Sequence, residues 1–216
     1  MSPLLGIYGI GGCGRGIMPF AHSAFRRSMG PESRVVFVDD QVTAAKTNGH
    51  STMDLTRFLA TPAAARYMCI AIADPRTRAR VWERCESSGI MPWTAVAESA
   101  VLMDDIALGA GAAISPFVTL ASNIRIGRHF HANIYSYVEH DCVIGDFVTF
   151  APGAKCNGNV VVEDYAYLGS GAMIRQGSSG APVVIGTGAI IGMGAVVLDS
   201  VAPGSVMVGN PARRIR

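Results

Sequence analysis

An apolar residue returns at every sixth position along the second half of the chain. An α-helix has a period of 3.6 residues and a strand has a period of two, so neither accounts for a repeat of six. A parallel β-helix does, because each hexapeptide supplies one short strand and one corner, and three hexapeptides complete a triangular coil. The thirteen repeat positions are Leu102, Leu108, Ile114, Leu120, Ile126, Ala132, Val138, Ile144, Phe150, Cys156, Val162, Leu168 and Ile174.

Glycine and aromatic content support the same architecture. Glycine often follows the main repeat position, as at Gly109, Gly127 and Gly145, and 16 of the 25 glycines lie after residue 98. We interpret these glycines as corners, because glycine adopts backbone conformations that other residues avoid. Aromatic residues make up only 7% of the chain, which suits a thin prism. The repeat pauses at Ser178–Pro182 and resumes at Ile185, so we expect a protruding loop there.

The first 98 residues follow a different pattern, in which apolar strands alternate with helices. Such alternation with short connections predicts a small parallel sheet of the α/β class. We therefore expect an α/β domain over 1–98, a β-helix over 99–200 and a tail over 201–216. The expected strands are 4–9, 34–38 and 68–73, and the expected helices are 15–29 and 76–88.

Composition excludes several classes of protein. Half of the residues are apolar and only 16% are charged, which is untypical of disordered chains. No run approaches the ~18 apolar residues of a membrane span, and the first residues lack the basic segment of a signal peptide. A net charge of +2 with two lysines argues against a nucleic-acid-binding surface. Five cysteines without a C-x-x-C pair predict free thiols in a cytoplasmic protein, and no ligand cluster predicts a metal.

A glycine-rich segment, GIGGCG at residues 9–14, joins the first expected strand to the first expected helix. Its G-x-G-x-x-G spacing lets backbone amides approach a diphosphate at a helix N-terminus. Asp39 and Asp40 end the second expected strand, where a dinucleotide site would hold a ribose. The segment alone indicates a nicotinamide-binding module. However, a domain of about 95 residues is short for a complete dinucleotide fold, so a site for another nucleotide stays open.

His140 is placed by the repeat itself. Val138 and Cys142 face the interior, so the intervening Glu139, His140 and Asp141 must form a corner that projects outward. A histidine has a pKa near neutrality and suits a general base, and a neighbouring carboxylate can hold one ring nitrogen as a donor. The alternative is a solvated surface histidine among charges. Because Cys142 is expected in the core, covalent catalysis through its thiol is a weak rival.

These motifs together resemble a known family. From residue 99 to the Gly209-Asn210-Pro211-Ala212 tail, the chain looks like a bacterial hexapeptide-repeat acyltransferase. With its first half included, it resembles the sialic acid O-acetyltransferase and bacillosamine N-acetyltransferase family. The resemblance implies a Rossmann-like domain followed by a left-handed β-helix, a homotrimer, and a role in O-antigen and lipopolysaccharide synthesis.

The same resemblance implies transfer of acetyl from acetyl-CoA to the amine of a nucleotide-linked amino-dideoxy sugar, with the C4 amine of GDP-perosamine as the expected acceptor. O-acetylation of a sialic acid-like sugar, a non-catalytic nucleotide-binding trimer and a metal-dependent anhydrase are the alternatives. His129, His131 and His140 lie in the wrong phase for an anhydrase metal site.

Roles of single residues follow from matching positions. The resemblance implies that His140 is the base, that Asp141 raises its basicity, and that Asn133 and Glu139 bind the acceptor. Thr149 stands where a relative has a second histidine near the thioester. Because a threonine donates one hydrogen bond but is no acid at neutral pH, we place Thr149 at the cofactor.

Two larger groups are expected around the ligands. The resemblance places the sugar nucleotide at Gly12, Cys13, Gly14, Asp39 and Asp40. It places the pantetheine arm of coenzyme A along Gly158, Ser170, Gly171, Met193 and Gly194. Each of these glycines is also explained by a corner alone. We expect the Ser178–Pro182 loop to contact coenzyme A or a neighbouring subunit, since loops that interrupt a solenoid are often functional.

Overall fold

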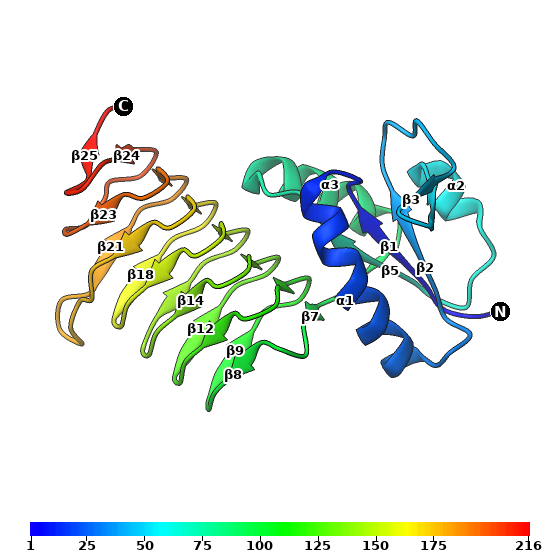
Figure 1. The fold of residues 1–216 in the computed structure, drawn as a ribbon, viewed down its shortest axis with the longest axis horizontal. Coiled ribbons are helices and arrows are strands. Elements are labelled where there is room, and N and C mark those ends of the chain that lie inside the picture. Colours follow the sequence, from blue (N-terminus) through cyan, green and yellow to red (C-terminus); the bar gives the residue numbers. More distant parts are fainter.

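The computed structural model describes residues 1–216 in two parts, an α/β part and a long β-helix that carries it at one end (Figure 1). The α/β part holds one six-stranded sheet in the order β3-β4-β2-β1-β5-β6. All neighbouring strands are parallel except the pair β3 and β4. The strands are β1 (Leu4–Tyr8), β2 (Arg34–Val38), β3 (Lys46–Thr47), β4 (His50–Met53), β5 (Arg66–Ile70) and β6 (Met91–Pro92). The expected small parallel sheet is therefore confirmed.

Three helices accompany this sheet: α1 (Gly12–Met29), α2 (Leu55–Ala60) and α3 (Pro75–Ser87). Asp74 is the N-cap of α3, and its side chain accepts a hydrogen bond from the Thr77 N–H at 2.8 Å. Pro75 suits the first helical turn. The sequence predicted α1 from Arg15, whereas the helix begins three residues earlier because the glycine segment forms its first turn. The short elements β3, β4 and α2 were not predicted, since two to six residues carry too little periodicity.

The β-helix consists of three parallel sheets, which we call the first, second and third faces. The first face holds β7 (Ala95–Val96), β10 (Ala113–Ile114), β13 (His131–Ala132), β16 (Thr149–Phe150), β19 (Tyr167–Leu168), β22 (Ile190–Ile191), β24 (Val206–Val208) and the antiparallel β25 (Arg213–Arg214). The second holds β8 (Val101–Leu102), β11 (Thr119–Leu120), β14 (Tyr137–Val138), β17 (Lys155–Cys156), β20 (Met173–Ile174) and β23 (Val196–Val197). The third holds β9 (Ile106–Leu108), β12 (Ile124–Ile126), β15 (Val143–Ile144), β18 (Val160–Val162) and β21 (Val183–Ile185).

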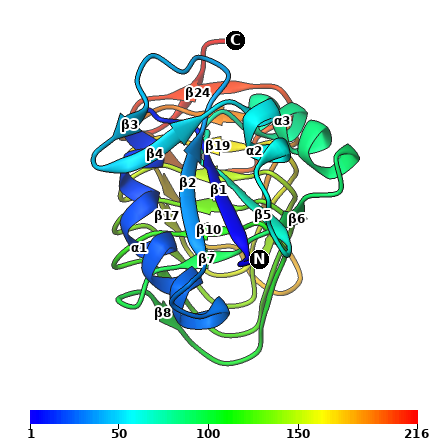
Figure 2. The same cartoon turned by 90° about the vertical axis from the view of Figure 1, so that its right-hand side faces the viewer.

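Strand register confirms three hexapeptides per coil. Ala113 pairs with His131, His131 with Thr149, and Thr149 with Tyr167, each step being three hexapeptides along the chain. Figure 2 shows the coils stacked behind the N-terminal sheet. The inward repeat positions from Ile114 to Ile174 are buried. Leu102 is 42% exposed, because the first coil has no full coil beneath it to cover that position.

The β-helix extends beyond both of the limits that the repeat predicted. β7 already pairs with β10 at Ala95–Val96, ahead of residue 99. In the expected tail, β24 adds to the first face beside β22, and β25 pairs with β24. Strands outside the strict six-residue pattern therefore extend the first face at both ends.

Glycine makes some of the corners, as expected, with left-handed backbone angles at positions such as Gly171 (φ 67°) and Gly194 (φ 66°). Other corners have asparagine, aspartate, histidine or aromatic residues in this conformation, for example Asn123 (φ 60°) and Asp141 (φ 57°). Gly109 and Gly127 have no such angle. A Cβ on Gly109 would lie 2.4 Å from the carbonyl carbon of Gly127 in the next coil. These repeat glycines are thus required by the close approach of stacked coils and not by backbone conformation.

Arg78 on α3 joins the two parts. Its side chain is fully buried, and its guanidinium donates to five backbone carbonyls: Ile72 (2.7 Å), Ala73 (3.1 Å), His129 (3.0 Å), Phe147 (2.7 Å) and Val148 (3.1 Å). The last three acceptors belong to the β-helix. Burial lowers the pKa of Arg78 to about 9, so the group remains protonated at neutral pH.

Candidate active site

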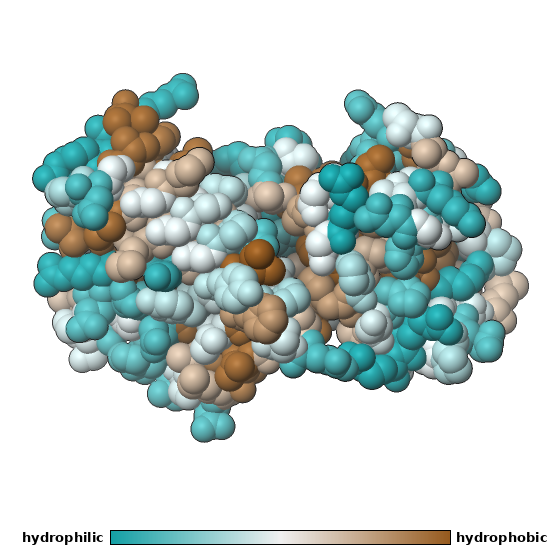
Figure 3. All heavy atoms as spheres, in the orientation of Figure 1, coloured by the Kyte–Doolittle hydropathy of each residue, from teal (hydrophilic) through white to brown (hydrophobic).

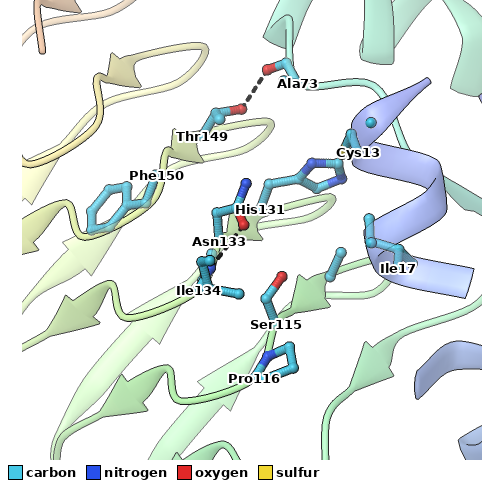
Figure 4. A pocket seen from close by; sticks show the side chains of 14 residues that line it. Cys13, Ile17, Ala73, Ser115, Pro116, His131, Asn133, Ile134, Thr149 and Phe150 are labelled. Atoms are coloured by element: carbon cyan, nitrogen blue, oxygen red, sulfur yellow. Dashed lines mark hydrogen bonds between the residues drawn. The ribbon is translucent and has the colours of Figure 1, made fainter. Parts of the chain in front are cut away.

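A cleft of about 370 Å³ lies between the N-terminus of α1 and the first face of the β-helix (Figure 4). It brings together residues that are far apart in the sequence, including Gly12 and Cys13 from the glycine segment and Asn133 and Thr149 from the β-helix. The remaining lining residues are Gly16, Ile17, Ala73, Ala113, Ser115, Pro116, His131, Ala132, Ile134 and Phe150. Four of the residues expected to bind ligands therefore share one cleft.

The glycine segment is held in a tight turn that leaves the first turn of α1 open. A Cβ on Gly14 would lie 1.8 Å from the Gly9 carbonyl oxygen, so only glycine fits at that position. The helix has no side-chain cap, and Gly12 at its start is exposed. Uncapped N–H groups together with the positive end of the helix dipole favour an anion such as a phosphate.

Asp39 and Asp40 both have protein partners. Asp39 accepts a hydrogen bond from the Ile10 N–H at 3.0 Å and so anchors the glycine segment to the end of β2. Asp40 accepts from the Tyr8 hydroxyl at 2.7 Å and from both terminal nitrogens of Arg84. The hydrogen bonds from Arg84 and Tyr8 lower the pKa of Asp40. Both carboxylates thus have partners within the α/β part, at the end of β2.

Asn133 and Thr149 present polar groups at the floor of the cleft. The Asn133 Oδ1 accepts the Ile134 N–H at 2.8 Å, which leaves the side-chain NH₂ group as a donor for a ligand. The Thr149 hydroxyl donates to the Ala73 carbonyl at 2.8 Å, and its side chain is almost fully buried. Thr149, which the sequence assigned to the cofactor, therefore lies beside the residue assigned to the sugar, and its proton already has an acceptor.

His140 and Asp141 form an exposed pair on the edge where the second face turns into the third, which we call the second edge. The His140 Nδ1 lies 2.7 Å from the Asp141 Oδ2, and 55% and 49% of the two side chains are exposed. This hydrogen bond, and secondarily the negative charge of Asp141, raise the pKa of His140 above its ordinary value. The arrangement fixes the imidazole and leaves Nε2 free to accept a proton. Glu139 precedes the pair and is half-buried.

Gly158 lies against the imidazole of His140. A Cβ at this position would come within 2.6 Å of Cε1 and 2.7 Å of Nε2. Gly158 has no left-handed backbone angle, so the ring itself is what requires the missing side chain. A residue that the sequence assigned to the cofactor thus also sets the position of the expected base.

The other residues expected along coenzyme A follow the edge where the first face turns into the second, which we call the first edge. Ser170, Gly171 and Gly194 are exposed there, and the Gly194 N–H donates to the Ser170 carbonyl at 2.9 Å. Met193 is 82% exposed. Asn133 lies on the same edge, whereas His140 lies on the second edge. Within one chain, the expected base therefore lies on a different edge of the β-helix from the cleft.

Cys142 faces the core, as the repeat predicted. Its side chain is 1% exposed and its Sγ donates to the Asn157 carbonyl at 3.2 Å. A thiol in that position is inaccessible to a thioester. No group of three or more histidine, cysteine, aspartate or glutamate side chains is placed to hold a metal ion, and no helix is long and apolar enough to cross a membrane.

Comparison with known proteins decides the family. GDP-perosamine N-acetyltransferase of Escherichia coli O157:H7 is 50% identical over 213 residues, which cover 99% of this chain and 96% of that protein. The chain belongs to the GDP-perosamine N-acetyltransferase family. No family model matches it.

Two solved structures share the architecture of this N-acetyltransferase. WeeI from Acinetobacter baumannii AYE is 44% identical, with a TM-score of 0.95 over 99% of this chain and 100% of that one. PerB from Caulobacter crescentus, solved in complex with CoA and GDP-perosamine, is 24% identical, with a TM-score of 0.81 over 99% and 97% of the two chains. At that identity the likeness establishes the fold.

Sequence reasoning did not identify two residues that shape this acetyltransferase. Arg78 was predicted only as part of the helix over 76–88, and His131 was considered only as a metal ligand. One available signal was position: His131 immediately precedes the inward repeat position Ala132, so it must face outward from the first face. That the first face is covered by α1 was not visible in the repeat.

Proposed function

We propose that this protein transfers the acetyl group of acetyl-CoA to the C4 amine of GDP-perosamine. The observation that carries this proposal is the His140–Asp141 pair, an oriented and exposed imidazole–carboxylate pair that suits a general base, on a hexapeptide-repeat scaffold. The family to which the chain belongs supports the acceptor, and the 50% identity extends over nearly the whole of both proteins.

In the proposed mechanism His140 takes a proton from the amine while the amine attacks the thioester carbonyl. A C–N bond forms, the C–S bond breaks, and the leaving thiolate takes the proton back from the His140 imidazolium, so that coenzyme A leaves as the thiol. Asp141 stabilises the imidazolium through the Nδ1–H hydrogen bond. Backbone N–H groups would stabilise the developing oxyanion. The buried position of Cys142 supports direct transfer over a covalent thiol intermediate.

Separate groups of residues would bind the sugar nucleotide and coenzyme A. The open first turn of α1 would hold the diphosphate, with the Asp39 and Asp40 region at the nucleotide base and Asn133 at the sugar. The exposed first edge with Gly171 and Gly194 would hold the pantetheine arm. This assignment treats the α/β part as a Rossmann-like nucleotide domain and the three-faced part, from β7 to β25, as a left-handed β-helix.

We further propose that the active site is shared between subunits of a cytoplasmic homotrimer. Within one chain, His140 lies on the second edge, whereas the cleft and the pantetheine wall lie along the first edge. Packing the second edge of one subunit against the first edge of the next would bring them together. Exposed apolar side chains such as Phe117 (55%), Tyr135 (62%) and Val143 (49%) support such association, and Figure 3 shows apolar surface over the β-helix.

The function is tested by measuring release of the coenzyme A thiol from acetyl-CoA with different acceptors. GDP-perosamine should give turnover, whereas UDP- and dTDP-linked 4-amino sugars should react poorly. Mass spectrometry should locate the acetyl group on nitrogen. Turnover only with free sugars that carry no nucleotide would contradict the role given to the glycine segment, and O-acetylation of a sialic acid would overturn the acceptor class.

A further inference from the structure

The side chain of Asn157 connects three successive coils of the β-helix. Asn157 follows β17 and is half-buried. Its Oδ1 accepts a hydrogen bond from the Tyr137 hydroxyl at 2.9 Å, and its Nδ2 donates to the Ile174 carbonyl at 2.7 Å. Tyr137 lies on β14, one coil before Asn157, and Ile174 lies on β20, one coil after it. Because a backbone carbonyl can only accept, the Ile174 oxygen fixes which end of the amide faces it.

This side chain compensates for a long main-chain contact between coils. The backbone nitrogen of Asn157 lies 3.4 Å from the Ile174 carbonyl oxygen, whereas the equivalent bonds from Glu139 and Arg175 to their own neighbouring coils measure 2.9 Å. The side-chain amide of Asn157 reaches the same Ile174 oxygen at the shorter distance of 2.7 Å. A side chain therefore holds the backbone at this point of the second edge.

The segment that Asn157 begins supports the corner that carries His140. The Asn157 carbonyl accepts from the Cys142 Sγ at 3.2 Å, and the Asn159 N–H donates to the His140 carbonyl at 3.0 Å. Between them, Gly158 lies against the His140 ring, where a Cβ would come within 2.6 Å of Cε1. Three consecutive residues on one coil thus contact the corner of the coil before it.

The direction of the His140 ring depends on few neighbours, because 55% of the side chain is exposed. Asp141 holds Nδ1 at 2.7 Å, and the Gly158 backbone lies against the edge formed by Cε1 and Nε2. A displaced Gly158 would let the ring turn about the hydrogen bond to Asp141 and would change the direction of Nε2. A general base acts only when it is aligned with the proton that it removes.

We propose that Tyr137 and Asn157 are positioning residues, which hold the Gly158 backbone against the imidazole of His140 and thereby fix the direction of Nε2. This inference rests on the proposed function, because it takes His140 to be the base. Both residues act through Gly158 and not by contact with a substrate.

The test measures steady-state kinetics of Tyr137→Phe and Asn157→Ala with acetyl-CoA and GDP-perosamine. Asn157→Ala removes both hydrogen bonds and should lower kcat on the order of tenfold, because slight misalignment of a base lowers the rate strongly. Tyr137→Phe keeps the bond to Ile174 and should lose less. The KM values should stay within about twofold of wild type, since the interaction acts on the transition state. Thr119→Ala, beside Tyr137 on the second face, is the matched control and should leave kcat unchanged.

Combination with His140→Ala separates positioning from a general structural effect. Without the imidazole nothing remains to be positioned, so Asn157→Ala should not lower the residual kcat of His140→Ala any further. A variant that merely loosens the β-helix should lower both rates by the same factor.

Two outcomes would overturn the proposal: wild-type kcat in both folded single variants, or an equal loss of kcat from Asn157→Ala in the presence and absence of His140. Circular dichroism and thermal unfolding identify a variant that fails to fold. If Asn157→Ala fails, Tyr137→Phe, alone and combined with His140→Ala, decides in the same way. Full activity of His140→Ala would instead contradict the proposed function.

Discussion

His140 depends on the residue that follows it in the chain. Asp141 adopts a left-handed backbone conformation with φ of 57°, which aspartate tolerates better than most residues, and this brings its carboxylate to 2.7 Å from Nδ1. The carboxylate favours the tautomer with a proton on Nδ1, which leaves the Nε2 lone pair free to accept a proton. Gly158 keeps the space beside the ring open.

Replacing His140 tests the role of the base directly. His140→Ala should lower kcat at least about a hundredfold, which is typical for loss of a general base. Cys142→Ala should retain most of the activity, because its thiol is buried in the core. Steady-state kinetics with acetyl-CoA and GDP-perosamine provide the measurement. Full activity of the histidine variant would exclude the mechanism.

The pH dependence of the reaction should report the His140–Asp141 hydrogen bond. Asp141 raises the pKa of His140 above 6.5, so the unprotonated base accumulates, and kcat/KM rises, as the pH increases through that raised value. Asp141→Asn removes the charge and weakens the hydrogen bond, so the acidic limb should move to lower pH while the maximal rate falls. An unmoved limb in a pH–rate profile of this variant would show that another group controls it.

At the scale of elements, α3 holds the α/β part on the β-helix. Arg78 lies in the first turn of this helix, and Trp82, one turn further along, packs on His129 with ring centroids 4.4 Å apart. His129 stacks on Phe147, which stacks on Tyr165, so the edge where the third face turns into the first presents an aromatic column to the helix. The cleft exists because this contact places the start of α1 beside β13 and β16.

Removing the Arg78 guanidinium should therefore destabilise the protein and deform the cleft. Arg78→Met leaves several buried carbonyls without donors, each costing about 1–3 kcal/mol, so we expect a loss on the order of 3 kcal/mol or more. Arg78→Lys retains the charge but has fewer donors and should lose less. Urea unfolding measures both variants. Wild-type stability of Arg78→Met would show that the contact with the β-helix depends on other residues.

At the scale of the whole molecule, a site shared between subunits predicts complementation. His140→Ala lacks the base, and Gly12→Asp places a negative charge where the diphosphate is expected, in open space that accepts a side chain. Each variant alone should be nearly inactive. Co-expressed mixed trimers should recover activity, because some interfaces combine an intact cleft with an intact His140.

Purified mixed assemblies carrying two different affinity tags provide the measurement, with activity normalised to each homomeric variant. Mass spectrometry should confirm that mixed trimers form. If their activity is no higher than the sum of the activities of the two homomeric variants, the complete site lies within one chain.

The degree to which the site could be predicted varied with the range of the interactions involved. The outward position of His140 followed from local register, because Val138 and Cys142 flank it as inward residues. The neighbouring carboxylate of Asp141 is adjacent in the chain and was equally accessible to sequence reasoning. The position of Thr149 could not be derived, since its partner Ala73 lies 76 residues away in the other part.

The six-residue period alone was sufficient to specify the β-helix and its coil size, because inward side chains stack on identical positions of neighbouring coils and any change of phase would expose them. The role of the repeat glycines Gly109 and Gly127 could not be predicted, because the close approach between coils is a property of the stacked structure. The cleft, the Arg78 contact and the enclosure of His131 arise from packing between segments that are far apart in the chain, and the hydrogen bonds of Arg78 and Thr149 between the two parts join residues 51 to 76 positions apart. Such packing depends on the shapes of two finished surfaces, which no local pattern encodes.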